Sequence, residues 1–105
     1  LSTYPNPMAR EIALNHHERW DGTGYPYQLE GPMIPLSARI VTIADVYDAL
    51  RMKRSYKEAY DHETSIEKML AWKGKNFDPQ LFDVFMTIQS DFEKIYADNA
   101  DEEPN

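Results

Sequence analysis

Residues Leu36–Leu50 read LSARIVTIADVYDAL and form the segment around which we expect the chain to fold. Its apolar residues lie nearly all the way round a helix, so we predict a central helix that other helices cover. Asp45 and Asp48 interrupt it one turn apart on one face. An unpaired carboxylate in apolar surroundings is costly, so both need partners. Either they bind a metal ion, or they mark the one solvated edge of the helix and pair with a nearby arginine. The candidate arginines are Arg39, Arg51 and Arg54.

A shorter helix is predicted upstream, beginning at Pro7 with Asn6 as its cap. Its apolar residues recur at helical spacing and are Met8, Ala9, Ile12 and Ala13. Four residues after the last two come His16 and His17, so we expect both imidazoles to continue the inward-facing stripe. Polar groups at such positions need either a metal ion or a buried hydrogen bond.

The histidines open the string HHERWDGTGYP, residues 16–26. Imidazole is the commonest protein metal ligand. Gly22 and Gly24 allow a positive φ or a close approach of the backbone. The alternative is a helix end with histidines near the negative end of its dipole, followed by a glycine turn. Residues 21–35 are rich in glycine and proline, and we predict an ordered, functional loop there.

The downstream half of the chain predicts two more helices. Asp61 caps a helix over residues 62–73 that ends at Gly74, with His62 as an exposed first-turn residue. Asp78 caps the last helix. The residues predicted to face inward are Ile66, Met69 and Leu70 in the first helix and Leu81, Phe85, Ile88, Phe92 and Ile95 in the last. The fold class is therefore all-α, a helical bundle with one domain over residues 1–97 and a disordered acidic tail over 98–105.

Composition excludes several classes of function. The 105-residue chain has a net charge of −7, which opposes general affinity for DNA or anionic membranes. It contains no apolar run long enough to cross a bilayer. It has no cysteine, which is compatible with a cytoplasmic location. Residues 51–57 form a basic island, which indicates either an anionic ligand or a solvated connection between helices.

The string HHERWDGTGYP closely resembles the signature of the HD-GYP family of bacterial signalling phosphodiesterases. The similarity spans about residues 8 to 90 and continues in order and spacing. Its further segments are Ile34-Pro35-Leu36, Arg39-Ile40-Val41, the run from Ile43 to Leu50, the run from Arg54 to Lys57, Gly74, and Phe77-Asp78-Pro79. Ser55 stands where that family often has proline, a minor departure.

The resemblance implies an all-α domain that binds two or three metal ions, iron or manganese, and hydrolyses cyclic di-GMP. By position, His16, His17 and Asp45 correspond to metal ligands. Tyr25 corresponds to a residue that contacts the dinucleotide, and Arg54 and Lys57 to residues that hold its phosphates. The resemblance further assigns a structural role in the loop to Asp21, Gly22, Gly24 and Pro26, while Asp48 is expected to anchor a neighbouring helix or loop.

One feature of that family is missing. No His-Asp dipeptide occurs in this sequence, although such a pair gives the family its name. The resemblance therefore implies the C-terminal part of an HD-type metallophosphohydrolase domain, with the other half expected before Leu1. We expect the isolated chain to be inactive and to form a homodimer through the apolar face of residues 36–50. A sensory or receiver domain is the expected further partner.

Two other functions remain open beside this one. The first is a non-catalytic module that binds a cyclic dinucleotide or a signalling protein. The second is a phosphohydrolase that acts on ordinary nucleotides, against which the Gly-Tyr-Pro loop argues.

Overall fold

The structure, a computed structural model, describes residues 6–52 and 58–102, with side chains as far as residue 98. Within these ranges it is built of helices: α1 (Pro7–Asn15), the short 3-10 helix η1 (Gly31–Met33), α2 (Leu36–Arg51), α3 (His62–Leu70) and α4 (Pro79–Glu102). Extended pairing in the described ranges is confined to two isolated bridges, Asp21 with Glu30 and Lys73 with Phe77. The predicted all-α class is confirmed. None of the described helices has both the length and the apolar character needed to cross a bilayer.

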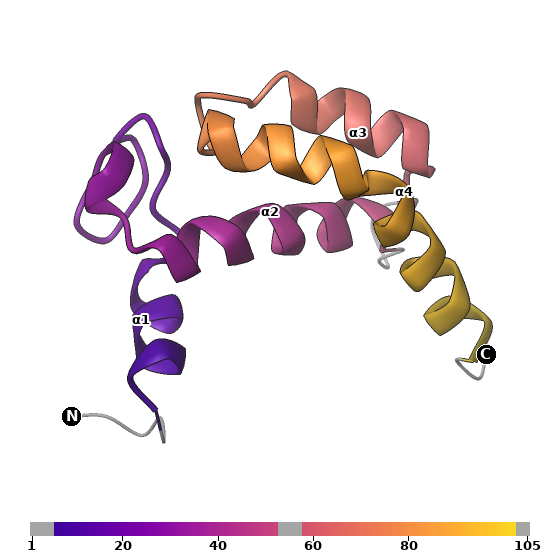
Figure 1. Ribbon diagram of the computed structural model, residues 1–105, viewed down its shortest axis with the longest axis horizontal. Coiled ribbons are helices and arrows are strands. Elements are labelled where there is room, and N and C mark those ends of the chain that lie inside the picture. The colour runs from indigo at the N-terminus through magenta and orange to yellow at the C-terminus, as the bar shows by residue number, and fades with distance from the viewer. Residues whose placement is uncertain (1–5, 53–57, 103–105) are drawn as a thin grey trace.

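Helix α2 is the centre of the fold, as predicted. Figure 1 shows α2 across the middle, with α3 and the first part of α4 covering one side and α1 at its amino end. Each of these three helices contacts α2. The core combines residues from all the elements on that covered side: Ile43, Tyr47, Leu50, Met69, Phe77, Phe82 and Phe85. In the amino-terminal half of α2, Leu36 and Ile40 stay exposed, so α2 is not covered along its whole length.

The capping predictions hold at three helix starts. The Asn6 side chain accepts a hydrogen bond from the Ala9 amide at 2.7 Å. Asp61 accepts from the Thr64 amide at 2.8 Å. Asp78 accepts from the amide of Gln80 at 2.9 Å. Each bond satisfies one of the donors that the first turn of a helix leaves unpaired.

The predicted inward stripe of α4 is wrong by one position in part of its length. Ile88 and Ile95 are 42% and 59% exposed, whereas Phe82 is fully buried. The observed stripe is Phe82, Phe85, Gln89, Phe92 and Tyr96. It alternates the same spacings of three and four, so the pattern alone could not separate the two. In α3, likewise, Leu70 is exposed and Ser65 is buried.

Two predicted helix ends are also wrong. Helix α3 ends at Leu70, three residues before the predicted end, and Gly74 with its φ of 79° lies in the turn that follows. Helix α4 continues to Glu102, so residues 98–102 are helical rather than the disordered tail that was expected. Extending an existing helix adds one hydrogen bond for each residue fixed, which does not require apolar side chains.

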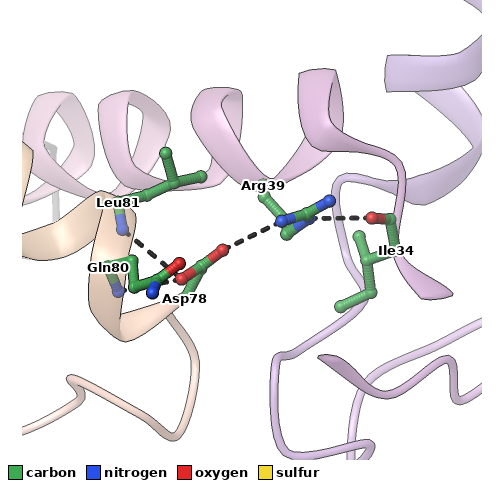
Figure 2. Close-up of polar contacts among 5 residues, drawn as sticks. All are labelled: Ile34, Arg39, Asp78, Gln80 and Leu81. Carbon is green, nitrogen blue, oxygen red and sulfur yellow. Dashed lines mark hydrogen bonds and ion pairs between the residues drawn. The ribbon is translucent and has the colours of Figure 1, made fainter. Parts of the chain in front are cut away.

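An ion pair fixes the amino end of α2 against the start of α4 (Figure 2). The Arg39 guanidinium donates to Asp78 at 2.9 Å and to the Ile34 carbonyl at 2.8 Å. The loop is tied to the same region, because the amides of Trp20 and Asp21 donate to the carbonyls of Asn76 at 3.4 Å and Lys75 at 2.9 Å. The loop after α1 is therefore held between α2 and the turn that connects α3 to α4.

Candidate metal and nucleotide site

The two histidines lie at the end of α1, where His16 caps the helix. Their ring centroids are 4.0 Å apart. Nδ1 of His16 is 2.9 Å from the Ile12 carbonyl oxygen. A carbonyl only accepts, so Nδ1 carries the proton and Nε2 keeps a free lone pair. Such a second hydrogen bond is the usual way in which a protein orients a metal-binding imidazole.

The prediction that both histidines face the core is wrong for His17. His16 is half-buried, whereas His17 is exposed. The reason is that α1 ends at Asn15, so the helical step of 100° no longer applies two residues later.

The loop folds back onto the histidine backbone at Gly24. The Tyr25 amide donates to the His17 carbonyl at 3.2 Å. A Cβ atom on Gly24 would lie 2.4 Å from that carbonyl oxygen and 2.5 Å from the Arg19 nitrogen, so only glycine fits there. Gly22 serves differently, because its φ of 84° favours a residue without a side chain. Both glycines thus act in the loop in the two ways that the sequence allowed.

Tyr25 is placed on the histidine pair by this fold of the loop. Its ring stacks on the His17 imidazole, with centroids 4.8 Å apart and planes 16° apart. The peptide bond from Tyr25 to Pro26 is cis. Asp21 shapes the start of the loop by accepting from the Thr23 amide at 3.0 Å and the Thr23 hydroxyl at 2.6 Å. These bonds lower the pKa of the Asp21 carboxyl.

Glu18 is a site residue to which the sequence assigned no role. Only 2% of it is exposed. Its two carboxylate oxygens accept from the amides of Tyr27 at 2.7 Å and Leu29 at 2.8 Å. The one sequence feature that could have indicated this role is its position between the histidine pair and a glycine loop. The sequence does not reveal its partners, because they are backbone amides.

A cavity of about 180 Å³ brings these groups together. It is lined by His16, His17, Glu18, Arg19, Tyr25, Thr42, Val46 and Asn76. Thr42 anchors the wall formed by α2, since its hydroxyl lies 3.1 Å from the His16 carbonyl oxygen. Two of the three predicted metal ligands and the predicted nucleotide-contacting tyrosine therefore share one cavity.

The two aspartates of α2 are outside this cavity. Asp45 and Asp48 are both exposed, and Asp48 lines a different cavity of about 230 Å³ beside Tyr47 and Tyr96. Among the described residues no three histidine or acidic side chains are grouped closely enough to hold a metal ion. The metal role of Asp45 and the anchoring role of Asp48 stay predictions.

The arginines proposed as partners of these aspartates have other contacts. Arg39 pairs with Asp78, as described above. The Arg51 guanidinium donates to the Tyr47 hydroxyl at 2.7 Å and lies 4.6 Å from the centre of the Tyr96 ring. Arg39 thus contacts the carboxylate that caps α4, and Arg51 contacts one ring of α2 and one ring of α4. The local sequence pattern did not indicate either contact. Arg54 and Lys57, the predicted phosphate-binding residues, lie outside the described residues.

The description of His62 as an exposed first-turn residue is wrong. Its ring is half-buried and bridges two helices, with Nδ1 2.9 Å from the Tyr47 hydroxyl and Nε2 hydrogen-bonded to Gln89. The Arg51 guanidinium donates to the same hydroxyl, so the hydroxyl proton is available to His62 Nδ1. His62 thus joins α2, α3 and α4 through hydrogen bonds, and it does not line the cavity of the candidate site.

The described residues therefore form a helical fold in which adjacent imidazoles, a tyrosine stacked on one of them and a glycine loop meet at one cavity. The chain belongs to the HD domain family, whose family model matches residues 2–81. This match confirms the resemblance found in the sequence.

The relatives of this chain are named as phosphodiesterases of cyclic dinucleotides. A probable cyclic di-GMP phosphodiesterase of Vibrio cholerae is 49% identical over 96 residues, which cover 91% of this chain and 22% of that protein. A cyclic di-GMP phosphodiesterase response regulator of Xanthomonas campestris is 48% identical over 84 residues, covering 80% of this chain and 22% of that protein. A crystal structure of a cyclic GMP-AMP specific phosphodiesterase from Vibrio cholerae superposes with a TM-score of 0.59 at 31% identity, covering 77% of this chain and 20% of that one. The chain spans about a fifth of the length of these relatives.

Proposed function

We propose that this chain forms part of the active site of a metal-dependent phosphodiesterase that hydrolyses cyclic di-GMP. The observation that carries the proposal is the single cavity lined by His16, His17 and Tyr25, with the tyrosine ring stacked on one imidazole. The names of the relatives support a cyclic dinucleotide as the substrate class.

The residues present fit part of a metal centre. His16 offers Nε2 as a ligand atom because its Nδ1 is engaged with a carbonyl. His17 is the second ligand, and Asp45 is the proposed third. The remaining ligands come from parts of the protein beyond the described residues. The proposed centre holds two or three ions. They are iron or manganese, because imidazole and carboxylate ligands suit these metals. Bound ions supply an activated water and polarise the phosphate oxygens.

The chain's other residues bind and position the dinucleotide. Tyr25 offers an exposed ring face beside the histidines, on which a base can stack. Arg54 and Lys57 neutralise and orient its phosphates, as guanidinium and ammonium groups do. With less than a full ligand set, the isolated chain is expected to have little or no turnover.

The wider setting of the domain is part of the same proposal. The response regulator among the relatives supports a receiver domain as a partner in the longer protein. The exposed Leu36 and Ile40 of α2 support contact with the other half of the domain, or a homodimer in its absence. We also propose a cytoplasmic location, with which the absence of cysteine from the sequence is compatible.

A matched pair of tyrosine variants tests the proposal in the longer protein that contains this chain. Tyr25 and Tyr27 are two residues apart and 60% and 61% exposed. Base stacking contributes about 1–3 kcal/mol, so Tyr25→Ala should weaken cyclic di-GMP binding by about 5- to 150-fold. Tyr27→Ala should leave it unchanged. Hydrolysis is followed by chromatography of the products with added Mn²⁺ or Fe²⁺.

The results separate the two leading functions. Binding and hydrolysis that require His16 and His17 support the enzyme, whereas binding without hydrolysis supports the non-catalytic module. Equal binding by wild type and Tyr25→Ala would refute the assignment of this cavity to the dinucleotide. Robust hydrolysis by the isolated 105-residue chain would contradict the expectation that it is inactive.

A further inference from the structure

Glu18 is a buried carboxylate whose partners are main-chain amides of the loop. Its exposed fraction is 2%, and its oxygens accept from Tyr27 and Leu29 at 2.7 and 2.8 Å. Bonds of this length from an N–H to a charged oxygen are among the stronger protein hydrogen bonds. A buried charge is tolerated only when it is satisfied in this way. The carboxylate and the two amides therefore depend on each other.

The backbone between these amides has an unusual conformation. Gln28 has a φ of 53°, and it is the one residue other than glycine with a positive φ in the described part of the chain. Neighbouring amides around a left-handed residue turn toward a common point and form a concavity that suits an anion. Here that anion is internal, because the Glu18 carboxylate occupies the concavity.

The loop is therefore held at two points, once by the His17 backbone and once by the Glu18 side chain. On one side the Tyr25 amide donates to the His17 carbonyl at 3.2 Å, and Gly24 packs against the same carbonyl. On the other side the carboxylate of the next residue, Glu18, holds residues 27 and 29. Tyr25 lies between these two attachments and stacks on His17.

We infer that Glu18 is a positioning residue, whose carboxylate holds the Gly24–Leu29 loop so that the Tyr25 ring stays on the His17 imidazole. It does not touch substrate or metal in this role. Its effect on nucleotide binding rests on the proposed function, whereas its effect on the loop does not. Loss of the carboxylate should move Tyr25 without unfolding the helices.

The first test uses the wild-type chain and a conservative variant. Amide hydrogen exchange in the wild type should be slower at Tyr27 and Leu29 than at Gln28, and equal rates at all three would overturn the proposal. Glu18→Gln keeps the shape of the side chain but sets an amide donor against one N–H. Losing one charge-assisted bond should speed exchange at Tyr27 or Leu29 by at least about tenfold.

A second readout reports on the ring contact itself. A nuclear Overhauser effect between the His17 and Tyr25 rings should be present in the wild type and lost in Glu18→Gln. The control is Glu30→Gln, which removes the same charge from an exposed position in the same loop and should preserve the contact. Retention of the ring contact in a folded Glu18→Gln variant would refute the proposal. If that variant does not fold, the exchange rates of the wild type still decide.

The functional consequence is measured in the longer protein. There Glu18→Gln should raise KM for cyclic di-GMP, by no more than the about 5- to 150-fold expected for Tyr25→Ala, with kcat changed less than about twofold, because binding depends on Tyr25. Glu30→Gln should match the wild type. If the wild type itself does not act on cyclic di-GMP, the proposed function fails, while the exchange and ring-contact data continue to test Glu18 independently. A fall in kcat at unchanged KM would overturn the positioning role.

Discussion

Replacing Asp78 with asparagine should destabilise the fold by removing the charge that Arg39 contacts. Asp78 is 5% exposed and Arg39 18% exposed, so water screens the pair little. One carboxylate oxygen accepts from Arg39 at 2.9 Å, and the other accepts from the amides of Gln80 at 2.9 Å and Leu81 at 3.4 Å (Figure 2). Asparagine caps a helix about as well as aspartate, so the substitution isolates the ion pair.

The expected loss of stability is about 2 kcal/mol. Breaking a fully buried ion pair costs about 3–5 kcal/mol. A hydrogen bond to a charged group contributes about 1.5–3 kcal/mol. The lower range applies here, because Arg39 is partly exposed and keeps its bond to the Ile34 carbonyl at 2.8 Å. For a domain of this size, 2 kcal/mol corresponds to a fall in Tm of about 10 °C.

Asp83→Asn provides the matched control in the same helix. Its ion pair with Lys73 is shorter, at 2.6 Å, but Asp83 is 64% exposed. Exposed pairs contribute about 0–1 kcal/mol, so this variant should unfold near the wild-type midpoint. Exposure, and not the distance between charges, is thus predicted to rank the two variants.

Urea unfolding followed by tryptophan fluorescence measures both variants. Trp20 lies 6.0 Å from the Arg39 guanidinium and reports on this region. In an Arg39→Met background, Asp78→Asn should cost less than about 1 kcal/mol, because the partner is already gone. Equal losses for Asp78→Asn and Asp83→Asn, or an unchanged cost in the Arg39→Met background, would refute the reasoning.

Three further predictions concern the loop and the pH dependence of stability. Gly24→Ala should abolish cyclic di-GMP binding while the circular dichroism spectrum stays helical, because the added Cβ would lie 2.4 Å from a carbonyl oxygen. The control is Gly74→Ala, whose Cβ would meet nothing within 4 Å. It should lower the free energy of unfolding by about 1 kcal/mol and leave binding intact. Burial raises the pKa of Tyr47 above its ordinary 10.0, so the stability that its neutral form contributes is complete below pH 10 and lost above it. The urea midpoint of the wild type should therefore fall more steeply above pH 10 than that of Tyr47→Phe. Hydrogen bonds from Thr64 lower the pKa of Asp61 below 3.8, so wild-type stability should fall as the pH drops through that range, and Asp61→Asn should reduce this dependence in acid unfolding curves.

The sequence predicted the elements whose signals are local. Caps at Asn6, Asp61 and Asp78 begin helices where expected, because each cap acts within three residues. The inward stripe of α4 was not determined in this way, since Leu81 and Phe82 fit the same spacing. The bond from His62 to Gln89 contributes to the observed register, and it joins residues in different helices. No local pattern contains that information.

The candidate site divides along the same line. Adjacent histidines, two glycines and a tyrosine are side-chain features of one short string, and the structure brings their side chains or backbone together. The role of Glu18 was not predicted, because its partners are backbone amides, which nearly every residue has. Asp45 was predicted as a ligand by resemblance, and among the described residues it does not join the histidines.

The amides of Trp20 and Asp21 donate to carbonyls in the turn between α3 and α4, far along the chain. During folding, this loop gains its long-range bonds only after that turn has formed, because the entropy of loop closure over such a separation must be lost before the contact can stabilise the chain. The bonds should therefore be absent from the folding transition state. Substitutions that weaken them should speed unfolding and leave the folding rate almost unchanged. The loop that forms the candidate site would then be the last part of the molecule to assemble and the first to open.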